Sequence, residues 1–178
     1  EIHPHEHDAI AWLTAGKPPS VEPVLPANGP ILKGLALPTT CALTNAEENG
    51  TALELSRLKA ALTNGLRFIQ VRDKGLPAAV RADFAREVVA LGKAHGAIVV
   101  VNDTPDLARA IGADGIHLSS RSLAQCLEKP EFEWVGASCH SIEELKQAAA
   151  LELDYALLGP VLPTPTHPDA ASLGWHVF

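Results

Sequence analysis

From residue 39 onward, short apolar runs alternate with longer segments whose apolar residues recur at helical spacing. The runs AIVVV (97–101) and YALL (155–158) are continuously apolar, which favours parallel strands covered on both faces. The same reasoning predicts six strands, at residues 41–44, 67–71, 97–102, 115–118, 134–138 and 154–158.

The segments between these runs predict helices. Leu55, Leu58 and Leu62 recur at helical spacing, and so do apolar residues from 80 to 91. Ser141 and Glu144 form a capping box that opens a further helix, and two shorter helices are predicted at 106–111 and 122–127. Strand–helix alternation of this kind indicates parallel βα units, in either an open doubly wound sheet or a closed barrel.

Residues 1–38 do not share this pattern. They are rich in proline and carry three of the eight histidines. Residues 8–13 fit one short helix or strand, and residues 17–30 read as an extended linker. The histidines of HPHEHD (3–8) alternate without helical spacing or a downstream partner set, so they do not predict a metal site. We therefore expect two parts, 1–38 and 39–178.

Polar residues follow nearly every predicted strand at its carboxyl end. They are Thr44 and Asn45; Gln70, Arg72, Asp73 and Lys74; Asn102 and Asp103; His117, Ser119 and Ser120; Ser138 and His140; and Thr164, Thr166 and His167. In an open sheet such residues gather mainly at the switch point of the strand order. A set at each strand favours a (β/α)8 TIM barrel, whose catalytic face is built this way.

Each set also has a purely structural interpretation. Arg72 and Lys74 lie two residues apart at a strand end, which suits a phosphate, but single cations of this kind are often solvated. Asn102 and Asp103 could cap the helix that follows. His117 alternates with apolar neighbours and could point into a packed layer.

Composition narrows the class of function. The formal net charge of −7 argues against a nucleic-acid binder, and no apolar run is long enough to span a membrane. Three scattered cysteines and no signal-peptide pattern predict a reducing, cytoplasmic location. The chain contains no methionine, so we expect its first residue not to be the native start.

Four segments together resemble the thiamine phosphate synthase and thiazole tautomerase superfamily. They are FIQVRDKG, VVVNDTPDLARAIGADGIHLSS, WVGASCHSIEELKQA and DYALLGPVLPTPTHPDAASLGW, and the resemblance runs from about residue 37 to 175. It implies a TIM barrel of which 39–178 holds about six of eight βα units, so the chain alone is expected to be inactive. The implied partners are small phosphorylated thiamine precursors.

The resemblance also implies roles for individual residues. Gln70, Arg72 and Lys74 match pyrimidine and pyrophosphate contacts. Asn102 and Asp103 match the pair that holds pyrophosphate and Mg²⁺, and Ser138, Thr164 and Thr166 match phosphate contacts. Two positions depart from the synthase pattern: Ser122 replaces the second Mg²⁺ acid, and His167 replaces a loop lysine. A weakened Mg²⁺ site is therefore expected.

Three functions stay open at this point. The first is a synthase that couples an aminopyrimidine diphosphate to a thiazole phosphate. The second is a thiazole tautomerase, in which His140 would be the catalytic acid and base. The third is a non-catalytic ligand-binding or structural partner of a Nudix hydrolase domain in the same parent chain. Residues 1–38 are similar to the tail of Nudix hydrolases (8-oxo-dGTPase-like) fused upstream of such barrels, although the Nudix box itself is absent.

Overall fold

The computed structural model describes residues 11–14, 17, 24–102, 104–164 and 172–178. The chain forms two compact units, Glu1–Thr39 and Thr40–Phe178. The first contains a 3-10 turn, Pro26–Asn28, followed by helix α1, Gly29–Ala36, and none of its described residues is buried. No helix in the described ranges is both long and apolar enough to cross a membrane.

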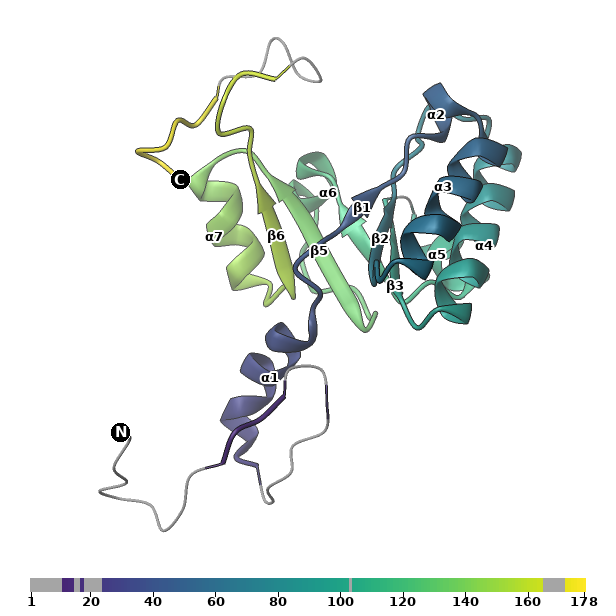
Figure 1. Ribbon diagram of the computed structural model, residues 1–178. Coiled ribbons are helices and arrows are strands. Elements are labelled where there is room, and N and C mark those ends of the chain that lie inside the picture. Colours follow the sequence, from purple (N-terminus) through teal and green to yellow (C-terminus); the bar gives the residue numbers. More distant parts are fainter. Residues whose placement is uncertain (1–10, 15–16, 18–23, 103, 165–171) are drawn as a thin grey trace. The chain divides into compact units, whose positions relative to one another are not determined.

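The second unit is built on a parallel sheet whose six described strands follow chain order from β1 to β6 (Figure 1). The sheet curls into a half-barrel. All six predicted strands are confirmed, with bounds that differ by at most one residue at either end. The strands are β1 (Ala42–Leu43), β2 (Phe68–Val71), β3 (Ile98–Val101), β4 (Gly115–Leu118), β5 (Trp134–Cys139) and β6 (Tyr155–Leu158).

Helices connect the strands and cover the outer face of the sheet (Figure 1). They are α2 (Ala46–Asn49), α3 (Thr51–Thr63), α4 (Ala78–Ala94), α5 (Pro105–Ile111), α6 (Ser120–Ala124) and α7 (Ile142–Ala150). The predicted cap of α7 is present, because the Ser141 hydroxyl accepts from the Glu144 amide at 3.1 Å. The Glu144 carboxylate accepts from the His140 amide, one residue before the usual capping-box donor.

Three local predictions were wrong. The expected linker at 17–30 overlaps the 3-10 turn and the start of α1, where Pro30 presets the helical φ angle in the first turn. Residues 11–14 of the expected short element 8–13 are irregular, and 8–10 lie outside the described residues. Helix α6 starts at Ser120 because Ser119, rather than a later residue, caps it.

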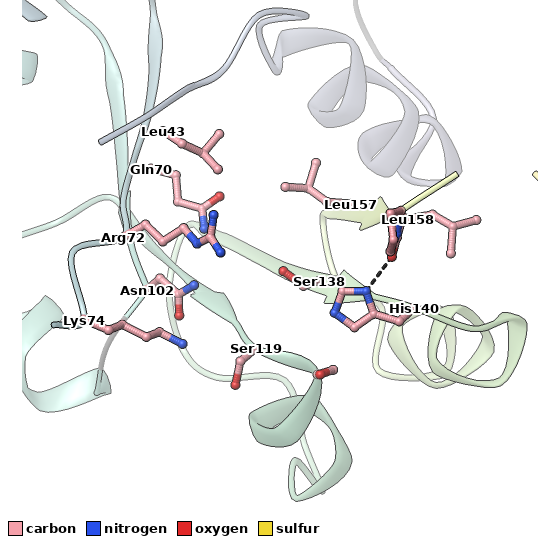
Figure 2. A pocket seen from close by; sticks show the side chains of 13 residues that line it. Leu43, Gln70, Arg72, Lys74, Asn102, Ser119, Ser138, His140, Leu157 and Leu158 are labelled. Carbon is pink, nitrogen blue, oxygen red and sulfur yellow. Dashed lines mark hydrogen bonds between the residues drawn. The ribbon is translucent and has the colours of Figure 1, made fainter. Parts of the chain in front are cut away.

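Alternation along each strand divides the side chains between two faces. Toward the interior of the half-barrel lie polar residues of four different strands or strand ends: Gln70, Asn102, His117 and Ser138. Several of them border a cavity at the carboxyl ends of the strands (Figure 2). The fold thus converts separate strand ends into one polar site.

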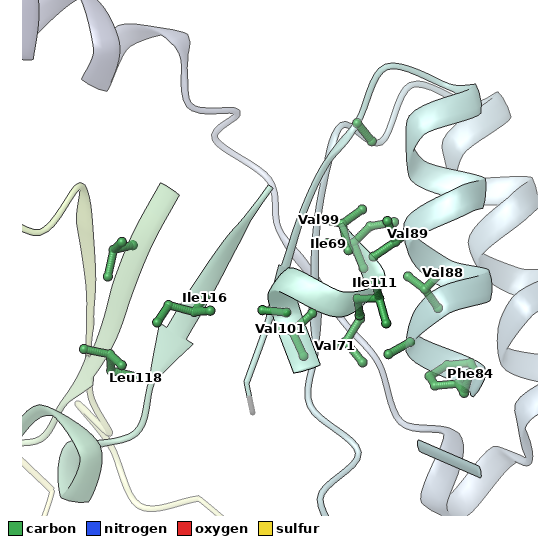
Figure 3. Close-up of a cluster of buried hydrophobic side chains, with 14 of the residues drawn as sticks. Ile69, Val71, Phe84, Val88, Val89, Val99, Val101, Ile111, Ile116 and Leu118 are labelled. Atoms are coloured by element: carbon green, nitrogen blue, oxygen red, sulfur yellow. The ribbon is translucent and has the colours of Figure 1, made fainter. Parts of the chain in front are cut away.

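The alternate residues of the same strands face the helices and form the hydrophobic core. Ile69, Val71, Val99 and Val101 are at most 2% exposed and pack with the helix α4 residues Phe84, Val88 and Val89 (Figure 3). Burial of such side chains stabilises by roughly 1.5–3 kcal/mol each, so this layer fixes the strands that carry the site.

Candidate functional site

A cavity of about 420 Å³ lies at the carboxyl ends of the strands. Figure 2 shows Arg72, Lys74 and Asn102 reaching into it from one side, and Ser138 and His140 from the other. The complete lining is Leu43, Gln70, Arg72, Lys74, Asn102, Ser119, Ser120, Ser138, His140, Leu157, Leu158, Gly159 and Pro160. Six residues predicted as site residues therefore meet in one place.

Arg72 and Lys74 give the cavity its positive charge. Both side chains are exposed, and within the described part of the chain neither makes an ion pair with a carboxylate. The residue between them, Asp73, is 2% exposed and accepts from the Ala46 and Glu47 amides and from the Thr44 hydroxyl. The buried aspartate anchors the turn while the two cations stay available for an anion.

Gln70 brings a hydrogen-bonding group with no protein partner. The residue is 2% exposed, and its Oε1 atom has no hydrogen bond in the described structure. An orphaned buried acceptor is destabilising by about 1–3 kcal/mol unless something donates to it. A ligand N–H in the adjoining cavity would satisfy it.

Neutral donors complete the same wall. Asn102 follows β3 and is 8% exposed, and its amide nitrogen on the main chain donates to Val71. Ser119 and Ser120 enter from the start of α6, where the Ser119 hydroxyl accepts from the Ser122 amide at 3.2 Å. Amide and hydroxyl groups beside two cations suit an oxyanion.

The Ser138 hydroxyl is hydrogen-bonded to the buried imidazole of His117. Its Oγ lies 2.8 Å from Nε2 of His117, whose Nδ1 lies 3.0 Å from the hydroxyl of Tyr155. Burial, followed by the positive charges of Lys74 and Arg72, lowers the pKa of His117 to about 4. The imidazole is therefore neutral near pH 7, with one donor and one acceptor nitrogen.

His140 lies at the opposite rim of the cavity (Figure 2). Its Nδ1 contacts the Gly159 carbonyl oxygen at 2.5 Å. Because a carbonyl only accepts, Nδ1 donates its proton in this contact, which orients the imidazole at the cavity rim.

The remaining predicted residues do not line this cavity. Asp103, Thr166 and His167 lie outside the described residues. Thr164 is described and half-buried, but it is not part of the lining. Ser122 borders a neighbouring cavity of about 470 Å³, with its hydroxyl 2.8 Å from that of Ser119.

The described residues do not form a Mg²⁺ site. No group of three or more His, Cys, Asp and Glu residues within the described ranges is arranged to hold a metal. The segment Ser119–Ser122 offers hydroxyls and an arginine where Mg²⁺ would need carboxylate oxygen. The expected weak site at Asp103 stays a prediction, and no chemical step below depends on it.

Tyr155 is an inward-facing residue that the sequence analysis missed, because it treated residues 155–158 as one continuous apolar strand. Its ring packs edge-on against Phe68, with ring centroids 5.4 Å apart, and its hydroxyl reaches His117. Period-two alternation with Leu157, which lines the cavity, is the signal in the sequence that could have placed Tyr155 on the inner face.

These features define an α/β protein of parallel βα units, with a cavity at the carboxyl ends of its strands that is lined by two cations and several neutral polar side chains. The family model described as thiamine monophosphate synthase matches residues 40–178, and the chain belongs to that family. The match covers the whole of the second compact unit.

Named relatives agree with this assignment. The chain is 35% identical over 143 residues to a protein of Aquifex aeolicus provisionally named thiamine-phosphate synthase 2, covering 79% of this chain and 76% of the relative. It is 36% identical over 130 residues to a thiamine-phosphate synthase of Bacillus mycoides, covering 70% of this chain and 59% of that one.

A solved structure shows the same fold. The thiamine phosphate pyrophosphorylase of Pyrococcus furiosus superposes with a TM-score of 0.61 at 26% identity, over 77% of this chain and 65% of that one. The chain thus spans somewhat less than two thirds of the Bacillus and Pyrococcus proteins.

Proposed function

We propose that this unit binds the phosphorylated precursors of a thiamine-phosphate synthase reaction. The observation that carries the proposal is the set of Gln70, Arg72 and Lys74 on one cavity wall: two cations that have no carboxylate partner among the described residues, beside an orphaned amide oxygen. An aminopyrimidine diphosphate has both complements, an N–H donor for the amide and a pyrophosphate for the cations.

In this reaction the carbon–oxygen bond to pyrophosphate breaks, and the thiazole nitrogen forms a new bond to the same carbon. Arg72 and Lys74 would neutralise the negative charge that grows on the departing pyrophosphate. Gln70 would fix the pyrimidine, and Asn102 and Ser138 would add hydrogen bonds to phosphate oxygens. The protein contributes by orienting the two reactants and stabilising the leaving group.

A binding measurement tests the first half of the proposal. Pyrophosphate should raise the unfolding temperature of the chain, because a ligand bound only by the folded state stabilises it. The variants R72Q and K74Q should each weaken pyrophosphate binding about tenfold, while R86Q, whose side chain is exposed and paired with Asp83, should not change it. Equal binding by all four proteins would exclude this anion site.

Turnover tests the second half. The full-length protein that contains these residues, given both thiamine precursors and Mg²⁺, should form thiamine phosphate, and R72Q should slow it strongly. Binding without any product would favour the non-catalytic ligand-binding alternative. Absence of both would leave only a structural role.

The tautomerase alternative has one observation in its favour. His140 lines the cavity, and the contact between its Nδ1 and the Gly159 carbonyl fixes the imidazole at the rim. A base there could take a proton from a thiazole carboxylate phosphate and return it at another position. The variant H140Q should then abolish thiazole isomerisation while pyrophosphate still binds; unchanged isomerisation excludes His140 as the acid and base.

For residues 1–38 we propose the carboxyl-terminal end of a Nudix hydrolase domain in a longer parent chain. Their similarity to such tails supports this proposal. The full-length protein should hydrolyse 8-oxo-dGTP, whereas this chain should not. If replacing the carboxylates of a Nudix box upstream in the parent chain abolishes the hydrolysis, the hydrolase activity lies outside the second unit.

A further inference from the structure

Three interior residues form a continuous hydrogen-bonded row beneath the cavity. Tyr155 of β6, His117 of β4 and Ser138 of β5 are joined by contacts of 3.0 Å and 2.8 Å. His117 is 1% exposed and is not part of the cavity lining. Ser138 lies at the cavity wall, and it is the member of the row that can.

The strand geometry is arranged to admit this row. Gly136 lies on β5 opposite Tyr155 in the sheet register, and a Cβ atom at Gly136 would overlap the tyrosine ring. The missing side chain therefore leaves the space in which the ring stands. The row depends on three strands and on one glycine.

The direction of the hydrogen bonds follows from their endpoints. Within the described residues, the contact with His117 is the only hydrogen bond of the Tyr155 hydroxyl and of the Ser138 hydroxyl. If the imidazole donated to Tyr155, the phenol proton would have no acceptor in the interior. If Tyr155 donates to Nδ1, then Nε2–H donates to Ser138, and the Ser138 proton points to the cavity.

Acidity favours the same direction. A phenol, with an ordinary pKa near 10, is a better hydrogen-bond donor than a serine hydroxyl. The imidazole must be neutral to accept from Tyr155, and the neighbouring charges that reach it, Arg72 and Lys74, oppose its protonation. Tyr155 and Ser138 carry no charge near pH 7, since burial raises the pKa of Tyr155 further.

We propose that Tyr155 and His117 are positioning residues that orient the Ser138 hydroxyl as a donor toward a phosphate group in the cavity. This inference rests on the proposed phosphate site and adds two residues that act on it indirectly. An unoriented serine could donate or accept. With Nε2–H donating to it, Ser138 offers its proton to the same anion that Arg72 and Lys74 attract.

The protonation of His117 can be observed without any ligand. Long-range ¹H–¹⁵N spectra of the full chain at pH 7 should show His117 as the Nε2–H tautomer, with Nδ1 unprotonated. The Y155F variant, which keeps the ring and removes the hydroxyl, should shift the Nδ1 resonance or mix the tautomers. A pure Nδ1–H tautomer, or a cationic ring, contradicts the proposal even if phosphate binds well.

A double-mutant cycle tests whether Tyr155 acts through Ser138. With inorganic phosphate as the probe, S138A should lower affinity about tenfold and Y155F about fivefold. The double variant should be no weaker than S138A, because the oriented donor is already gone. If the two losses of phosphate affinity multiply instead, Tyr155 acts independently of Ser138, and the proposed positioning role is excluded.

A neighbouring substitution controls for packing. Cys139 follows Ser138 on β5, is fully buried on the opposite face against the helices, and belongs to the hydrophobic core. C139A should therefore leave phosphate affinity and the His117 tautomer as in the wild type. If C139A weakens phosphate as much as Y155F does, the Tyr155 effect is one of packing. Failure of the wild-type chain to bind phosphate would contradict the proposed function. The measured tautomer of His117 would still test the hydrogen-bond direction from Tyr155 through His117 to Ser138.

Discussion

The surroundings of His117 decide its protonation state and its role in the fold. In the chain it sits between Ile116 and Leu118, both buried against the helices. Its own side chain enters the interior, where it bonds to Ser138 and Tyr155. A histidine placed there is useful only while it is neutral, and this has a measurable effect on stability.

Acid should destabilise the fold through His117. Its pKa falls from 6.5 to about 4 on folding, because of burial and then of Lys74 and Arg72. Above pH 6.5 the ring is neutral in both the folded and the unfolded chain, and its full contribution to the free energy of unfolding is present. As the pH falls from 6.5 to 4 the unfolded chain takes up the proton first, and the free energy of unfolding drops by about 3 kcal/mol.

Urea unfolding at pH 7, 5.5 and 4 measures this effect. H117Q should show a smaller loss between pH 7 and pH 4 than the wild type, since Gln does not titrate. H176Q, which changes an exposed histidine, should keep the wild-type pH dependence. Parallel curves for the wild type and H117Q would show that His117 is not the titrating group.

At the scale of the element, each strand places one set of residues in the core and the next set in the site. Strand β5 does both over six residues, with Val135, Ala137 and Cys139 toward the helices. Gly136 and Ser138 lie on the other face. The strand therefore tolerates little change on either side.

Replacement of Gly136 tests the inner face of β5. In G136A the new methyl group overlaps the Tyr155 ring, so we expect a loss of about 2 kcal/mol in the free energy of unfolding, together with weaker phosphate binding. G34A adds a methyl to α1 where nothing lies within 4 Å, and it should be neutral or slightly stabilising. Wild-type stability of G136A would mean that Tyr155 moves aside without penalty.

The turn after β2 depends on Asp73. Its carboxylate accepts from the Ala46 and Glu47 amides at the start of α2, so D73A should lower the free energy of unfolding by about 2 kcal/mol. Hydrogen exchange at these two amides should accelerate more than elsewhere. D83A, on an exposed surface pair with Arg86, should change stability by less than about 0.5 kcal/mol. Unchanged exchange in D73A contradicts this capping role.

At the scale of the whole molecule, the two compact units differ in how they contribute to the fold. Among the described residues, the hydrophobic core contains only residues of the second unit, and none of the first unit is buried. The family match begins at residue 40, at the start of the second unit.

Removal of residues 1–39 should therefore leave the second unit folded. Its urea midpoint should be unchanged, and its pyrophosphate affinity should stay within about twofold of that of the full chain, because the described core and the cavity lining both belong to the second unit. Circular dichroism and calorimetric titration measure the two quantities. A large fall in the midpoint would show that the first unit contributes stability that its exposure does not reveal.

The sequence by itself determined the strand–helix order, all six described strands and the pairing of Arg72 with Lys74 on one side of a strand end. These follow from local rules, since side chains alternate along a strand and recur every 3.6 residues in a helix. The same rules did not show helix α1, which begins within the proline-rich stretch at residues 17–30, or helix α2, which has only four residues.

Tertiary structure alone decided which polar residues meet. Gln70 and Ser138 are 68 positions apart in the chain, and only the curl of the sheet brings them to one cavity. The tertiary structure also places Asp73 against the amides at the start of α2 and Tyr155 within hydrogen-bonding distance of His117. Both outcomes depend on contacts between strands and turns distant in sequence, so the carboxyl ends of parallel strands must first converge for the site to exist.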